Sequence, residues 1–335
     1  NRAIELGLAG IAITDHECLS ASPQINFYLE ELDKNEETKN FKIAIGNEIY
    51  LTGTRSDKQR YYHVILIAKN RNGYQALKEL SSYAWMNSYW DRGLERVPTL
   101  YNEIESIVKK YPNSLIATTA CLGGELSVNT LNLVNCEATG DTKGAKVAHE
   151  NIVNFILWCK EQFGNDFYIE CAPGCSSDQI KVNKRLVSIA KAFGLKMVIG
   201  SDAHYLKKED RYVHKAYLNS KGGEREVDEF YEYAYLQSDE EEMQYLSKSD
   251  FDPDFVKEMW KNSLEIYKKI EKYSIRHKQT IPKVEVNDYP KVENETAEFA
   301  EKYPTLLSME CSDDKVKRYW VNECRKRLKI YLRKI

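Results

Sequence analysis

The chain has 335 residues, of which 42% are hydrophobic and 30% are charged. This balance is typical of a folded globular protein, and the length is enough for one large domain or two ordinary ones. The formal net charge of −3 excludes a protein that is strongly basic overall, as many nucleic-acid-binding proteins are. No apolar run approaches the roughly eighteen residues of a membrane span, so we expect no membrane partner.

The cysteines and the first residues predict the cellular location of the chain and that it is a fragment. The eight cysteines are scattered, and the close pair Cys171 and Cys175 has no second pair at zinc-ribbon spacing. We therefore expect reduced thiols and a cytoplasmic location. The chain begins with Asn1 in the middle of a helical pattern, which predicts a fragment of a longer protein.

Short apolar runs alternate with helical patterns up to about residue 206. Apolar runs predict strands over 10–14, 41–51, 61–70, 114–120, 166–172 and 195–200. Helical periodicity predicts helices over 22–32, 72–86, 99–111, 146–163 and 179–193. Strands separated by such helices indicate βα units and an α/β fold with a mostly parallel sheet, either open or barrel-like.

The pattern changes after about residue 206. An acidic, Tyr-rich stretch leads to a predicted helix over 252–273, an extended segment over 281–296 and a final helix over 312–335. We expect a domain boundary between about 250 and 280. The final helix carries nine Lys or Arg and one acid from Lys315 onward. It is either an ordinary amphipathic helix with a solvated basic face or a helix whose basic face approaches a DNA backbone.

Several predicted strands end in side chains that bind metals. These residues are Asp15, His16, Glu48, Cys121, Glu170, Asp202 and His204. In a parallel barrel the carboxyl ends of the strands converge on one face, which we call the rim. His63 precedes its apolar run, but the turn-rich segment before it predicts an antiparallel hairpin with strand 41–51. That pairing would bring His63 beside Glu48.

Imidazole, carboxylate and thiolate are ligands that zinc and related divalent ions prefer. Taken singly, each of these residues would be interpreted as a turn residue, a helix cap or a small buried side chain. Three of the six histidines nevertheless fall at this rim, each near an acid or a thiol. The set therefore favours a metal site, and its several carboxylates suit two or three ions that activate water and clamp a phosphate ester.

The segments "AITDH", "IGNEIYL", "YYHVILIAKNRNGYQALKELSS", "LIATTACLGGEL", "FGNDFYIE" and "GSDAHYL" resemble, in this order and spacing, the PHP (polymerase and histidinol phosphatase) domain. The version at the front of bacterial C-family DNA polymerase III alpha subunits is the most similar. The resemblance implies a distorted (β/α)7 TIM-like barrel over residues 1–252, with its first motif, His-x-His, before Asn1. Residues 253–335 would be a connecting helix and the start of a polymerase palm.

The resemblance also implies residue roles. Two or three divalent ions (Zn, Mn or Fe) would be held by His16, Glu48, His63, Cys121, Asp202 and His204. Asp15 and Glu170 are candidate catalytic or orienting acids. The palm aspartates that hold Mg would lie beyond Ile335.

Three hypotheses follow from the resemblance. The chain is the PHP region of a replicative DNA-directed DNA polymerase, with a metal-dependent phosphoesterase or 3′–5′ exonuclease site. Alternatively, the domain is an inert scaffold that docks a separate proofreading exonuclease, or the chain is a stand-alone PHP phosphatase. The expected partners are DNA and, through the full-length protein, a proofreading exonuclease subunit and a sliding clamp.

Overall fold

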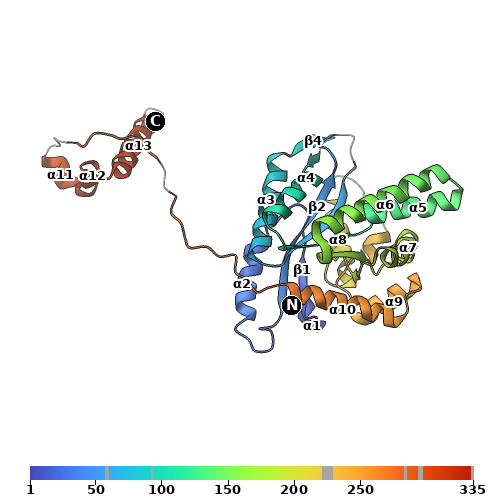
Figure 1. The fold of residues 1–335 in the computed structure, drawn as a ribbon. Coiled ribbons are helices and arrows are strands. Elements are labelled where there is room, and N and C mark those ends of the chain that lie inside the picture. The colour runs from blue at the N-terminus through green and yellow to red at the C-terminus, as the bar shows by residue number, and fades with distance from the viewer. Residues whose placement is uncertain (57–59, 92–93, 221–228, 283–284, 293–296, 333–335) are drawn as a thin grey trace. The chain divides into compact units, whose positions relative to one another are not determined.

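The computed structural model describes residues 1–56, 60–91, 94–220, 229–282, 285–292 and 297–332. Its contacts divide the chain into two compact units, Asn1–Arg276 and His277–Ile335 (Figure 1). Each unit is described separately below.

The first unit is built on one curled sheet. Its strands are β1 (Gly10–Ile13), β2 (Lys42–Thr52), β3 (Tyr62–Ala68), β7 (Leu115–Thr118), β8 (Phe167–Cys171) and β9 (Met197–Ile199), in that spatial order. Strand β6 (Pro98–Leu100) pairs with the far end of β2, beyond the part that pairs with β1.

The strand directions follow the expected mostly parallel pattern. β3 runs antiparallel to both β2 and β7, and the other pairs in this sheet are parallel. The predicted β2–β3 hairpin is therefore confirmed. This mixed α/β arrangement is the distorted barrel expected from the sequence.

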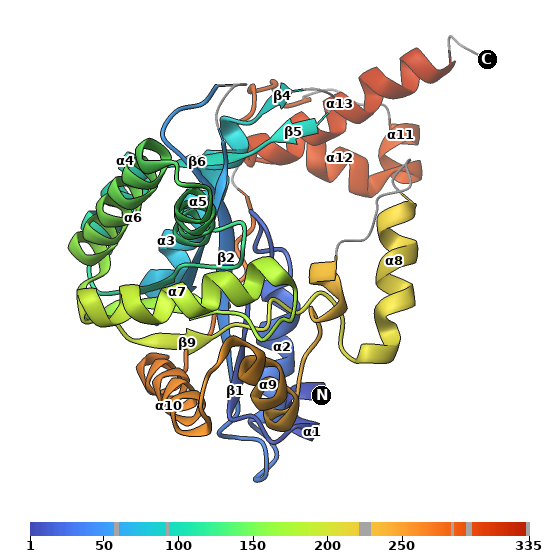
Figure 2. The same ribbon diagram turned by 90° about the vertical axis from the view of Figure 1, so that its right-hand side faces the viewer.

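Helices cover the sheet. They are α1 (Arg2–Glu5), α2 (Ser22–Leu32), α3 (Arg71–Met86), α4 (Tyr101–Lys110), α5 (Glu125–Thr139), α6 (Thr142–Phe163), α7 (Ser177–Phe193), α8 (Arg211–Asn219), α9 (Asp239–Leu246) and α10 (Pro253–Lys269). Figures 1 and 2 show α5, α6 and α7 grouped on one side, where α5 contacts both other helices. Local chemistry sets several boundaries: the Asn70 side chain caps α3, and Gly194, in the left-handed conformation, ends α7.

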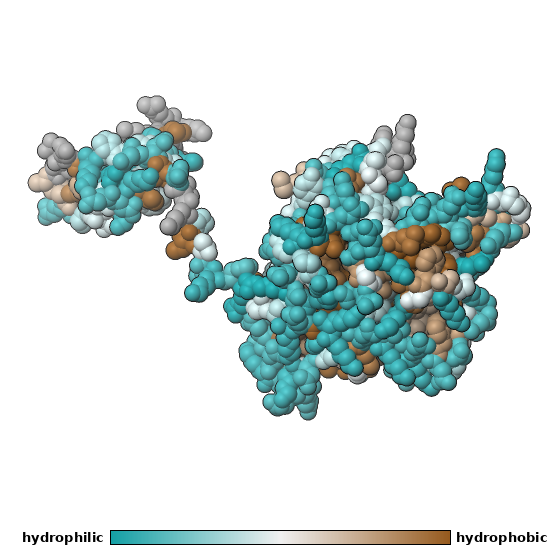
Figure 3. Space-filling view, in the orientation of Figure 1, coloured by the Kyte–Doolittle hydropathy of each residue, from teal (hydrophilic) through white to brown (hydrophobic). Residues whose placement is uncertain are grey.

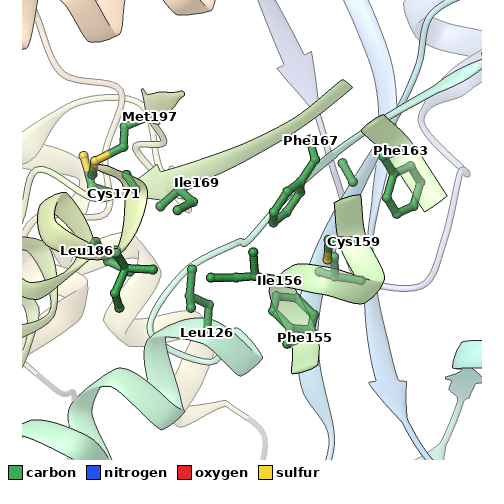
Figure 4. Packing of buried hydrophobic residues seen from close by; sticks show 14 of the residues in the cluster. Leu126, Phe155, Ile156, Cys159, Phe163, Phe167, Ile169, Cys171, Leu186 and Met197 are labelled. Atoms are coloured by element: carbon green, nitrogen blue, oxygen red, sulfur yellow. The ribbon is translucent and has the colours of Figure 1, made fainter. Parts of the chain in front are cut away.

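The main core lies between these helices and the sheet. Figure 4 shows the aromatic and aliphatic side chains of α6 packed against β8. Ile156 and Ile169 have no exposed surface, and Phe155 and Phe167 are 2% exposed. Burial of such side chains is worth about 1.5–3 kcal/mol each and holds α6 on the sheet. The surface in Figure 3 is mostly hydrophilic, with separate hydrophobic areas.

Helix α10 packs within the first unit. Lys42 of β2 donates hydrogen bonds to the carbonyl oxygens of Tyr267 (2.9 Å) and Ile270 (2.6 Å) at the end of this helix. Asn262 donates to the carbonyl oxygen of Met197 at 2.8 Å. The division between the two units falls after Arg276, so α10 belongs to the first unit.

The second unit contains α11 (Ala297–Lys302), α12 (Pro304–Glu310) and α13 (Lys315–Leu332). Arg318 of α13 is 7% exposed, and its Nε donates to the carbonyl oxygen of Tyr289 at 2.6 Å. Val321 is buried, whereas Val316, Trp320 and Leu328 are about half exposed. No helix among the described residues of either unit is long and apolar enough to cross a membrane.

Candidate metal centre

The loop after β1 places His16 beside Glu48. The Glu48 N–H donates to the carbonyl oxygen of Asp15 at 3.1 Å, and the Glu17 N–H donates to the carbonyl oxygen of Glu48 at 3.0 Å. These bonds extend the β1–β2 pairing as a bridge between His16 and Glu48. The His16 Nε2 lies 3.7 Å from a Glu48 carboxylate oxygen.

The antiparallel hairpin brings His63 to the same carboxylate. Tyr50 of β2 is paired with His63 of β3, so His63 lies one pleat from Glu48. The His63 Nδ1 lies 2.9 Å from Glu48 Oε1. One ligand atom from each of His16, Glu48 and His63 lies within 4.8 Å of the other two, so these three residues could hold a metal ion.

Cys121 follows β7 and faces this group. Its Sγ lies 3.3 Å from His63 Nδ1 and 3.7 Å from Glu48 Oε1, and it accepts a hydrogen bond from the Gly123 N–H at 3.4 Å. A Cβ at position 123 would lie 2.7 Å from His63 Nδ1. Glycine there lets the turn approach the imidazole closely.

Asp202 and His204 approach from the loop after β9. The His204 Nδ1 contacts the backbone oxygen of Asp202 at 2.8 Å and lies 3.6 Å from Asp202 Oδ1. Asp202 has a φ of 43°, a conformation that L-residues rarely adopt. Its carboxylate is hydrogen-bonded to Cys121 and interacts with the charges of Glu48 and His16. This second pair therefore borders the cluster of three without forming part of it.

The electrostatics of the rim favour a cation. Burial, together with Asp202 and Glu48, raises the pKa of Cys121 well above its usual value. Burial and the charge of Glu48 raise the pKa of Asp202. Burial also acts to raise the pKa of Glu48, but the His63 hydrogen bond and the His16 charge bring it below its usual value. Like charges held together out of water are relieved by a bound cation.

The two candidate catalytic acids have different surroundings. Glu170 of β8 is 7% exposed and accepts a hydrogen bond from the Thr118 hydroxyl. Burial is the main cause that raises its pKa to about 7. A Cβ at position 200 would lie 1.7 Å from its carboxylate, so Gly200 gives it room. Asp15 is exposed beside His16, and its backbone carbonyl closes the bridge to Glu48.

Sequence reasoning missed two residues that shape the site. The Tyr50 ring stacks on His16 with 5.0 Å between centroids, and it lies 5.4 Å from the His63 ring. Alternation along "NEIY" places Tyr50 on the same face as Glu48, a signal that could have identified it. Glu17 is 2% exposed and accepts the Tyr50 N–H at 2.5 Å, whereas its carbonyl accepts from Ser81 and Trp85. No feature of the sequence indicates that this acid is buried.

The three histidines outside the predicted set differ in exposure. His149 and His277 are exposed. His214 is 9% exposed, and its ring centroid lies 5.4 Å from that of His204. His214 therefore packs behind His204 and supports the loop after β9.

The donor chemistry fits a divalent ion. Two imidazoles and a carboxylate meet directly, and a thiol and a second carboxylate adjoin them. Mixed nitrogen, oxygen and sulfur donors suit zinc and related ions better than calcium or magnesium, which prefer oxygen alone.

The PHP domain family model matches residues 1–173, slightly more than half of the chain. The chain therefore belongs to the PHP domain family. It is 39% identical over 330 residues to the probable DNA polymerase YorL of Bacillus subtilis (strain 168), and equally to the DNA-directed DNA polymerase of Bacillus phage SPbeta. In each case the match covers 95% of this chain and 25% of the relative.

A more distant relative is the DNA polymerase III subunit alpha of Borreliella burgdorferi. It is 32% identical over 217 residues, which are 63% of this chain and 16% of the relative. The chain thus spans a quarter or less of these polymerases.

Proposed function

We propose that this chain is the PHP region of a replicative DNA polymerase and that its rim is a metal-dependent phosphodiesterase site acting in the 3′–5′ direction. The meeting of His16 and His63 on the buried carboxylate of Glu48 is the observation that carries the proposal. Cys121, Asp202 and His204 would complete the ligand set. The polymerase names of the relatives support a phosphodiester of DNA as the substrate.

Divalent ions in such a site lower the pKa of water and offset the negative charge of a phosphate ester. The protein would supply the rest from fixed positions. Glu170 can hold or release a proton near neutral pH, because burial raises its pKa to about 7. The exposed carboxylate of Asp15 would orient substrate or water beside His16.

The first test is elemental analysis of the purified chain, extended upstream to include the His-x-His motif expected before Asn1, beside the double variant Asp202→Ala/His204→Ala of the same extended chain. We expect roughly two to three equivalents of zinc, manganese or iron in the parent, and at least one fewer in the variant. The matched control is His149→Ala, which removes an exposed imidazole from α6 and should leave the metal content unchanged.

Hydrolysis of a labelled single strand of DNA is the second readout. Activity that depends on added metal and falls in the double variant supports the site. If the double variant loses metal but keeps its nuclease activity, the catalytic assignment is wrong. Bound metal without any nuclease activity in the parent would favour the scaffold that docks a separate exonuclease.

We further propose that the second unit begins a polymerase palm and that the full-length protein is a DNA-directed DNA polymerase. Its Mg-binding aspartates would lie beyond Ile335. It would act in the cytoplasm with a proofreading exonuclease subunit and a sliding clamp. The relatives extend well beyond the matched region, which supports this proposal.

A further inference from the structure

A row of aromatic rings, Tyr50, Tyr61 and Tyr89, extends from the candidate metal centre along the β2–β3 hairpin; we call it the aromatic wall. Tyr50 stacks on His16 and is paired with His63. Tyr61 lies two residues before His63, just outside β3, so the wall continues past the rim. The Tyr61 hydroxyl is hydrogen-bonded to the Tyr89 hydroxyl. The rings thus run from the ligand cluster to a neighbouring segment of chain.

That neighbouring segment is a small hairpin of β4 (Tyr89–Asp91) and β5 (Leu94–Arg96). It leads directly into β6, whose Pro98 is paired with Tyr50 on the side of β2 away from His63. In the hairpin itself, Tyr89 is paired with Arg96. The hairpin therefore places Tyr89 and Arg96 beside the Tyr61 ring.

Arg96 gives this wall a positive charge. Its guanidinium carbon lies 5.7 Å from the centroid of the Tyr61 ring. Its Nε lies 3.7 Å from a carboxylate oxygen of Asp91, and its side chain is 32% exposed. The guanidinium therefore lies against the Tyr61 ring and beside the acid of its own hairpin.

Asp91 shares the face of Tyr89 and Arg96, whereas other described groups of these hairpins lie on the opposite faces. Trp90, 72% exposed, is paired with Glu95, and strand alternation turns both away from Tyr89 and Arg96. Arg60 stacks on Tyr62 at 5.6 Å. Tyr62 points to the opposite side of β3 from His63. The same hairpins therefore supply control residues, Arg60 and Trp90, against which the residues of the wall can be compared.

We propose that Tyr50, Tyr61, Tyr89 and Arg96 form a track that binds single-stranded nucleic acid and leads its end to the metal centre. The inference rests on the proposed phosphodiesterase function. Aromatic rings and guanidinium planes stack on bases without regard to sequence, and a guanidinium also pairs with phosphate. A duplex keeps its bases stacked inside, so it cannot use the rings in this way.

The test is fluorescence anisotropy of a labelled oligothymidylate of roughly twelve nucleotides, within the usual site sizes of single-strand binders. The 335-residue chain is titrated in the presence of EDTA, so that binding is measured without hydrolysis. We expect Arg96→Gln to weaken binding at least about five-fold and to reduce the salt dependence by about one phosphate contact. Tyr61→Leu should weaken binding to a similar extent, whereas Tyr61→Phe should restore it because the ring is kept.

Arg60→Gln and Trp90→Ala are the matched controls, because they remove an arginine and an exposed aromatic ring from the opposite faces. Each should change affinity less than about two-fold. The track is wrong if Arg60→Gln weakens binding as much as Arg96→Gln, if duplex is bound as tightly as single strand, or if no oligothymidylate binds. Thermal melts of each variant ensure that only folded protein is compared.

The design separates this inference from the proposed function. Binding in EDTA that depends on Arg96, without metal-dependent nuclease activity in the chain extended upstream through the expected His-x-His motif, would refute the phosphodiesterase and leave the track. Metal-dependent hydrolysis of a small phosphodiester, without oligothymidylate binding, would refute the track alone.

Discussion

Glu242 gives the protein a pH-dependent stability that one substitution should remove. It lies on α9, and one of its carboxylate oxygens accepts a hydrogen bond from Trp260 Nε1 of α10 at 2.7 Å. Burial is the main cause that raises the pKa of this carboxyl from its ordinary value of 4.5 to about 7; the Trp260 hydrogen bond acts in the opposite direction. The folded state therefore keeps a proton that the unfolded chain releases.

The sign follows from proton binding. Between these two pKa values the folded state binds more protons than the unfolded state, so the free energy of unfolding falls as pH rises. The full difference of about 2.5 pH units corresponds to at most about 3 kcal/mol, and about 2 kcal/mol of it is lost between about pH 5 and pH 7. Glu242→Gln keeps an acceptor for Trp260 and has no proton to lose.

The assay is urea unfolding of the parent and of Glu242→Gln at about pH 5 and pH 7. We expect the variant to gain about 2 kcal/mol relative to the parent as pH rises over this interval. Glu258→Gln on α10 is the control, since that side chain is exposed and its loss should matter by less than about 0.5 kcal/mol at either pH. An equal difference between Glu242→Gln and the parent at both pH values would refute the reasoning.

Three further substitutions test packing. Gly73→Ala should cost about 1–3 kcal/mol in thermal melts, because a Cβ there would lie 2.2 Å from the carbonyl oxygen of Ser114; an unchanged melting temperature would mean that α3 can shift. Lys42→Met should cost about 2 kcal/mol by urea unfolding and speed amide exchange at the end of α10, since two carbonyls lose a charged donor. Gly200→Ala should displace Glu170, so nuclease activity should depend less on pH near pH 7 than it does in the parent. Loss of all bound metal would instead indicate a wider disruption of the rim.

The sequence predicted those elements whose apolar pattern is strong. Helix α2 was predicted over 22–32, as observed, and α7 was predicted within two residues at each end. Helix α5 was missed because it is buried on several sides: Leu126, Val128 and Leu133 are buried together with polar residues such as Asn129 and Thr130. A helix enclosed in this way has no single apolar face for periodicity to detect.

The short strands β4, β5 and β6 were missed for a different reason. Each has three residues, too few for an alternation to be recognised. Their place is set by tertiary contacts, such as the pairing of Pro98 with Tyr50. The final helix was expected to be amphipathic, but the structure leaves Val316, Trp320 and Leu328 about half exposed and buries Val321.

The candidate site was more predictable than the fold around it, because strand topology alone determines which side chains share a rim. The antiparallel direction of β3 is the critical step. If β3 ran parallel to β2, His63 would start at the opposite end of the sheet, and no nitrogen ligand would reach Glu48 from that side. The observed register pairs Tyr50 with His63 and leaves Glu48 one pleat away. Strand alternation could also have placed Tyr50 beside Glu48, although not its stacking on His16. Glu17 could not be found in this way, because its importance lies in burial, which depends on the packing of α3 and of the loop after β1.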